Sequence, residues 1–183
     1  MVESIIRRKG NYRDLLCYCK AEAIYDITYF FANKFLKMPD RTIDQMIQAA
    51  RSGKQNIIEG YSASATSAET ELKLLNVAKS SLKELLADYE DYLRTRNLRI
   101  WEECSIEFIK AQELGKTHNE TDYWMNIVRT RSDETIANIA IILLHQTDYL
   151  IYRFMENISS RFTQEGGFRE KLSRVRHNKI KSK

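Results

Sequence analysis

Residues 41–61 carry a hydrophobic pattern that an α-helix places on one side. Apolar side chains recur there at helical spacing, at Ile43, Met46, Ile47, Ala50, Ile57 and Tyr61. A second row of small or short side chains runs beside them, at Ala49, Gly53, Asn56 and Gly60. A glycine inside a helix costs about 1 kcal/mol relative to alanine, so Gly53 indicates a point where another helix packs closely. We therefore predict a helix here, with other helices arranged around it.

Three further segments show helical periodicity, and each follows a residue suited to cap a helix. Asn11 precedes the first segment, Thr66 and Glu69 form a capping-box pattern before the third, and Ser132 precedes the fourth. The first segment should bury a stripe made of Leu16, Cys19, Ala23, Ile27 and Phe30, flanked by Ile24, Phe31 and Phe35. We predict long helices at about 12–37, 41–61, 67–96 and 133–162. The fold class expected from them is all-α, an up-down-up-down four-helix bundle.

The segment 97–131, between the third and fourth predicted helices, is too long to be a bare loop in a compact domain. Its apolar residues predict a short helix that ends near 114–115 and a second one at about 121–129. We expect this inserted region to cover one end of the bundle. Residues 1–167 then form one domain, and 168–183 form a separate C-terminal tail.

The charge of the chain is unevenly placed. Residues 168–183 contain seven Lys or Arg and one Glu, whereas the remaining 167 residues carry 22 basic and 24 acidic side chains. A nearly neutral body argues against a broad nucleic-acid surface, and a basic tail permits a local one. A solubilising tail is an equally good interpretation of the same residues.

Two groups of cations are candidates for contacts with RNA or DNA. In the body, Arg51 and Lys54 lie close together in sequence, and Lys73, Lys79 and Lys83 follow. The acidic residues interspersed among them favour an ordinary solvated surface. The tail is the better candidate because its cations are concentrated, at Arg169, Lys171, Arg174, Arg176, Lys179, Lys181 and Lys183.

The polar end of the second predicted helix is open to two interpretations. Asn56, Glu59 and Gly60 could contact a ligand or RNA, or they could mark a helix packed against a neighbour. Small side chains and a single Asn favour packing, so we assign a helix-packing or interface role to Ala49, Gly53, Asn56, Glu59 and Gly60. Aromatic residues at helical spacing are interpreted as core or interface, at Tyr89, Tyr92, Tyr149 and Tyr152.

Catalytic, metal and cofactor sites are not predicted. His118, His145 and His177 stand apart, and no glycine-rich phosphate loop or Cys-x-x-Cys pair is present. The longest apolar run, 136–144, is too short to span a membrane. An odd number of cysteines, Cys17, Cys19 and Cys104, favours reduced thiols and hence a cytoplasmic location.

Three stretches of this sequence resemble one known family. NIIEG at 56–60, preceded by QAAR at 48–51, looks like the second-helix signature of the four-helix-bundle proteins encoded within bacterial rRNA intervening sequences. Residues 11–31 are similar to the first helix of that family and 70–93 to its third, while 133–160 match by pattern only. The long charged third helix and the tail resemble the family branch that carries a C-terminal suffix.

The resemblance implies a homo-oligomer, commonly a pentamer. It also implies kinship with the accessory variability determinant of diversity-generating retroelements, which binds nucleic acid and a reverse transcriptase through a basic surface. This chain departs from that relative in its nearly neutral body and in the 97–131 insertion. Two functions are therefore expected: a non-enzymatic homo-oligomeric scaffold that binds RNA, or a protein interaction module, such as a reverse transcriptase accessory, without a nucleic-acid role.

Overall fold

The computed structural model describes residues 10–37 and 40–165, and the regular structure within these ranges is entirely helical. The all-α prediction is therefore confirmed. A short 3-10 helix at Tyr12–Asp14 precedes α1 (Leu16–Phe35), α2 (Thr42–Ala63), α3 (Ala68–Thr95), α4 (Ile106–Thr117), α5 (Thr121–Val128) and α6 (Asp133–Glu165). The predicted basic tail, 168–183, lies outside the described residues.

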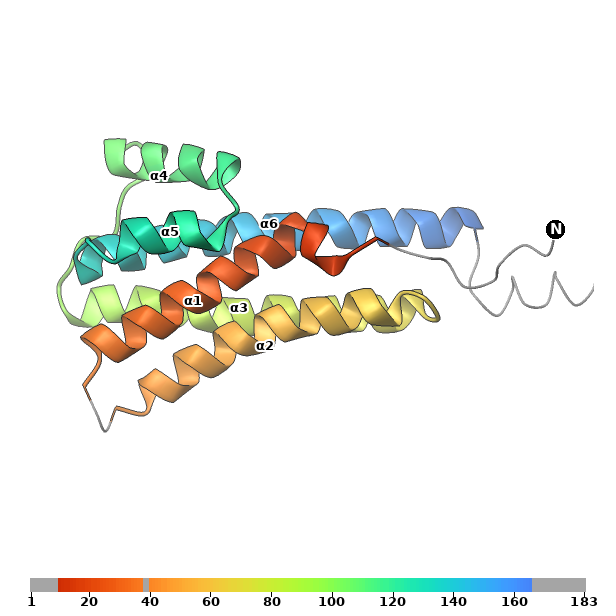
Figure 1. Cartoon of the computed structure of the whole chain (residues 1–183), viewed down its shortest axis with the longest axis horizontal. Coiled ribbons are helices and arrows are strands. Elements are labelled where there is room, and N and C mark those ends of the chain that lie inside the picture. The colour runs from red at the N-terminus through yellow and green to blue at the C-terminus, as the bar shows by residue number, and fades with distance from the viewer. Residues whose placement is uncertain (1–9, 38–39, 166–183) are drawn as a thin grey trace, which may run out of the picture.

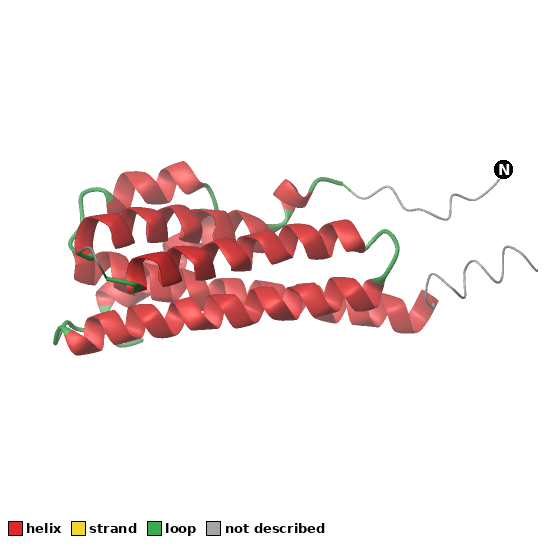
Figure 2. Cartoon of the chain, turned by 90° about the horizontal axis from the view of Figure 1, so that it is seen from below, coloured by secondary structure: helices red, strands yellow, loops and turns green. Residues whose placement is uncertain are grey.

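The long helices α1, α2, α3 and α6 lie side by side, as Figures 1 and 2 show from two directions. Contacts join α1 to α2, α2 to α3, α3 to α6 and α6 back to α1. The two short helices lie outside this set, where α4 packs against α6 and α5 packs against α1 (Figure 1). The inserted segment thus covers the flank formed by α6 and α1.

The interior is built from aliphatic and aromatic side chains of all four long helices. Phe31 of α1 packs its ring 5.1 Å from the ring of Tyr89 and 4.7 Å from the ring of Tyr92, both on α3. The Tyr89 hydroxyl donates a 3.0 Å hydrogen bond to Thr28 Oγ1, so the one polar atom of this buried ring has a partner. Trp124 of α5 is also buried, which attaches the insertion to the main core.

Of the three helix caps predicted from the sequence, one is confirmed and two are not. Asn11 accepts from Arg13 N, but it caps the 3-10 turn, and α1 starts only at Leu16 rather than at 12. The capping box predicted for Thr66 is wrong, because Ser67 is the cap of α3 and its hydroxyl accepts from Thr70 N at 3.1 Å. Ser132 Oγ accepts from Thr135 N at 3.3 Å, as expected of a cap for α6.

The predicted stripe of α1 is buried only in part. Leu16 is exposed, and Cys19 and Phe30 are only partly buried. Ala23 and Ile27 of the stripe and Ile24 and Phe31 of its flank are buried, and Cys17 and Ala21 are buried as well. The reason is that α1 packs against α2, α5 and α6 together, and three neighbours cover a wider face than one stripe provides.

Candidate functional site

The row of small residues on α2 lies against α3 of the same chain. A Cβ atom added to Gly53 would lie 2.5 Å from Leu82 Cδ2, and one added to Gly60 would lie 3.3 Å from the Glu71 carbonyl oxygen. Ala49 is buried on the same side of α2. The close approach of these two helices accounts for the small side chains without a ligand.

Asn56 extends this contact with a polar link. Its Nδ2 donates to Ser52 O at 2.9 Å and to Ser52 Oγ at 3.3 Å, and Ser52 Oγ lies 2.9 Å from Ser81 Oγ on α3. Glu59 is exposed on α2. The Asn56 amide therefore bonds within its own helix, next to a hydroxyl pair that joins α2 to α3.

The basic residues of the body do not form one surface. Arg51 is exposed, whereas Lys54 lies over the ring of Tyr25 on α1, with Nζ 4.3 Å from the ring centroid. On α3, Lys73 pairs with Glu69 at 2.7 Å, and Lys79 Nζ lies 3.4 Å from Asp148 Oδ1 on α6. The described cations are thus spread over several faces and are interleaved with carboxylates.

The tail holds the other predicted nucleic-acid contacts, its seven Lys and Arg residues. All seven of them lie outside the described residues: Arg169, Lys171, Arg174, Arg176, Lys179, Lys181 and Lys183.

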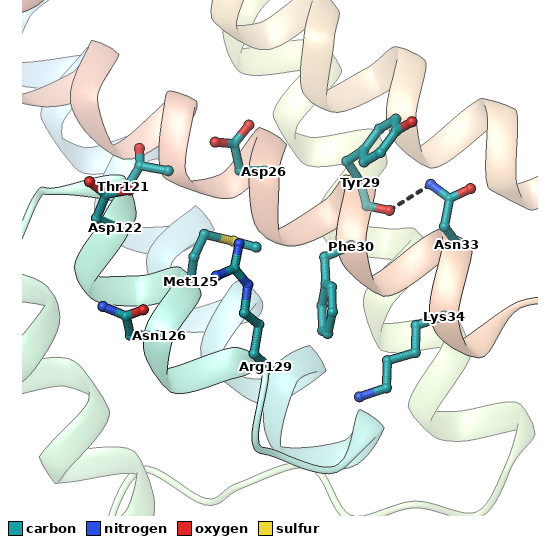
Figure 3. Close-up of a pocket in the computed structure, with 10 residues that line it drawn as sticks. All are labelled: Asp26, Tyr29, Phe30, Asn33, Lys34, Thr121, Asp122, Met125, Asn126 and Arg129. Atoms are coloured by element: carbon teal, nitrogen blue, oxygen red, sulfur yellow. Dashed lines mark hydrogen bonds between the residues drawn. The ribbon is translucent and has the colours of Figure 1, made fainter.

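A groove of about 700 Å³ opens between α1 and α5 (Figure 3). One wall is the outer face of α1 and the other is α5 with the residue that follows it. Its lining combines carboxylates, cations and apolar groups: Asp26, Tyr29, Phe30, Asn33, Lys34, Thr121, Asp122, Met125, Asn126 and Arg129.

The polar groups of the groove are segregated. Asp26 and Asp122 lie toward one end, Lys34 lies at the other, and Arg129 extends from that end toward Met125 (Figure 3). Burial raises the pKa of the Asp26 carboxyl, the Lys54 ammonium opposes this rise, and carboxylates nearby, including Asp122, add to it. The groove therefore holds two acids and two bases beside apolar side chains, an arrangement suited to a protein surface rather than to a polyanion.

Large apolar side chains are exposed on other outer faces as well. Tyr29 of α1 is 54% exposed, Ile106 of α4 is 68% exposed and Tyr149 of α6 is 60% exposed. By contrast, Tyr89 and Tyr92 lie in the core. The four tyrosines that the sequence predicts to lie in the core or at an interface thus form two pairs. One pair is buried, and the other, Tyr149 and Tyr152, faces outward.

Comparisons of this chain with protein-family models, with curated proteins and with solved structures find no match. Among the residues that the structure describes, no group of three or more His, Cys, Asp or Glu side chains is placed to hold a metal ion. Over the same residues, none of the helices combines the length and the apolarity needed to cross a bilayer.

Sequence reasoning missed the α1–α5 groove. Phe30 was placed in the buried stripe, and Asp26 and Lys34 look like ordinary surface charges of an amphipathic helix. The available signal was that the aromatic residues of 25–35 are distributed around the whole helix, which leaves α1 without a purely polar outer face.

Proposed function

We propose that this chain is an up-down-up-down four-helix bundle related to the family encoded in rRNA intervening sequences, and that it acts as a non-enzymatic, self-associating scaffold. The cyclic contacts of α1, α2, α3 and α6 support the bundle. So do the short connections between α1, α2 and α3, because short loops favour antiparallel neighbours.

The observation that carries self-association is the exposure of large apolar side chains on separate outer faces. Tyr29, Ile106 and Tyr149 are each more than half exposed, although the core of the same chain is fully formed. Single exposed apolar residues are common, but aromatic residues are enriched at the interfaces between subunits. The family resemblance favours five subunits.

Sedimentation velocity over a hundredfold range of protein concentration tests this proposal. We expect a species whose mass is a multiple of 21.5 kDa, and a shift to smaller species on dilution. A chain that stays monomeric at every concentration would refute the scaffold proposal.

Nucleic-acid binding is the second candidate function, and the concentration of charge in 168–183 favours it. Seven Lys or Arg against one Glu give this segment a net charge of +6. Contacts would be made to phosphates, with little reading of bases, because Lys and Arg without a shaped groove sense charge rather than sequence. The alternative is a protein interaction module without a nucleic-acid role, for which the family resemblance implies a reverse transcriptase as the partner.

A titration with labelled RNA and DNA at several salt concentrations measures this function. We expect the logarithm of the affinity to fall with the logarithm of the salt concentration, by about 0.7–0.9 for each phosphate neutralised. A chain that lacks 168–183 should lose this binding and keep its assembly. Absence of binding by the full chain at low salt would exclude the nucleic-acid role.

A further inference from the structure

The charges of the α1–α5 groove are ordered along both of its walls. Asp26 and Lys34 are eight residues apart on α1, or about 12 Å along the helix axis. On the other wall Asp122 and Arg129 are seven residues apart, and their order is the same. Figure 3 shows both carboxylates at one end and the Lys34 ammonium at the other. The groove is thus negative at one end, and both cations start from backbone positions toward the other end, although the Arg129 guanidinium reaches back to Met125.

Such a surface is complementary to itself after a half turn. When two copies face each other across a two-fold axis perpendicular to the length of the groove, the negative end of each copy lies against the positive end of the other. We propose that the α1–α5 groove is an interface between two copies of this chain, in which Asp26 and Asp122 of one copy face Lys34 and Arg129 of the other.

The middle of the groove supplies the apolar part of this interface. Phe30 and Met125 are partly buried there, and both pack against the core. Met adapts its shape to a neighbouring surface more readily than branched side chains do. Tyr29 lines the same groove with more than half of its side chain exposed, so it is able to contact the second copy.

The charge pattern distinguishes this occupant from others. A polyanion would meet the carboxylates of Asp26 and Asp122, and a uniformly basic segment would meet Lys34 and Arg129. Only a partner with the opposite order of charges satisfies both ends, and a second copy presents that order after a half turn.

The inference rests on the proposed self-association and names the surface that forms it. A two-fold contact alone produces a dimer, whereas a ring of five requires head-to-tail contacts between two different surfaces. The groove contact is therefore separate from any ring contact.

Two charge-reversed variants test the proposal. The acidic-end variant is D26K/D122K, and the basic-end variant is K34E/R129E. Each makes both ends of its groove alike in charge, so each variant alone should associate at least about tenfold more weakly than the native chain. An equimolar mixture should associate again, because both contacts of the mixed pair are then complementary. The matched control is K83E/K110E, which reverses two exposed cations on α3 and α4, outside the groove.

Sedimentation velocity measures association, and far-UV circular dichroism verifies that each variant is helical. Weaker association of each variant alone, restored in the mixture, supports the interface. Association unchanged by the variants refutes the groove interface and leaves the proposed scaffold intact. The groove interface is also refuted if the two variants are folded but their mixture does not associate. It is refuted as well if deletion of 168–183 weakens association as much as the groove variants do. A native chain that is monomeric refutes both proposals.

Discussion

The Lys20 ammonium of α1 donates a hydrogen bond to the Gly115 carbonyl oxygen in the last turn of α4. The last four carbonyl groups of a helix have no partner within that helix, and they form the negative end of its dipole. Lys20 is only 4% exposed, so its charge is removed from water by the helix that it caps. This contact links two segments that are 95 residues apart in sequence.

Replacement of Lys20 by Met should change how stability depends on pH. Burial lowers the pKa of Lys20 from its ordinary value of 10.5 to about 8, while Cys19 and Glu120 act weakly in the opposite direction. Between these values the unfolded chain binds more protons than the folded one, so this group makes the native chain more stable as pH rises. The free energy of unfolding of the native chain, relative to K20M, should increase by about 1 kcal/mol from pH 7 to pH 9.

Urea denaturation of both proteins at each pH gives this difference. The pH range of these measurements stops at 9 because burial also raises the pKa of the Cys17 thiol, from 9.0 to about 12. That thiol contributes stability that is lost as pH rises above 9, in the sense opposite to Lys20. Parallel pH profiles for the native chain and K20M would show that Lys20 does not titrate in this range.

Removal of the Asn138 amide should loosen the segment that leads into α4. Asn138 is 2% exposed, its Oδ1 accepts from Trp101 N at 2.8 Å, and its Nδ2 donates to Arg99 O at 2.8 Å. We expect N138A to lower the free energy of unfolding by about 2–4 kcal/mol, because two backbone groups lose their partner. Hydrogen exchange should accelerate more at 99–101 than in the middle of α2, where it follows only the change in global stability. Uniform acceleration would contradict this local role.

Gly53 and Leu82 should be energetically coupled. The Cβ of Ala at position 53 would lie 2.5 Å from Leu82 Cδ2 and 2.7 Å from its Cγ. We expect G53A to destabilise the chain by about 1–3 kcal/mol through overpacking, despite the better helix propensity of Ala. In an L82A background the same change should be neutral or stabilising, since the obstructing side chain is absent. Equal effects in both backgrounds would show that α2 and α3 separate freely at this point.

G60A is the matched control. Its expected loss of stability is smaller, because the Cβ added at position 60 would lie 3.3 Å from its nearest neighbour.

The buried hydrogen bond from Tyr89 to Thr28 should give a measurable coupling energy in a double-mutant cycle. Burial raises the pKa of the Tyr89 phenol well above its usual range, so the hydroxyl remains a donor at neutral and moderately alkaline pH. Y89F should cost about 1 kcal/mol, and T28V a similar amount. The double mutant Y89F/T28V should lose less unfolding free energy than the two single mutants added together. In each single mutant one polar group has already lost its partner, so removal of that group costs less. Thermal unfolding of the four proteins measures the coupling.

The positions of the helices follow from local signals in the sequence. Caps such as Ser132, the breaks between segments and the spacing of apolar residues act within one or two turns, so the chain length between them fixes which residues are helical. The same signals predicted two short helices within 97–131, and α4 and α5 lie there. Errors of a few residues remain where neighbouring residues compete to cap, as Thr66 and Ser67 do.

Tertiary structure alone decided which sides of the helices face each other and what the polar side chains do. A lysine in α1 looks like any surface charge until α4 covers it, and Phe30 looks like a core residue until α5 forms a groove beside it. Lys54 and Arg51 are three residues apart in sequence, yet only one of them lies against α1. Helical periodicity depends on neighbours a few residues away, whereas burial and charge pairing depend on segments brought together from far along the chain.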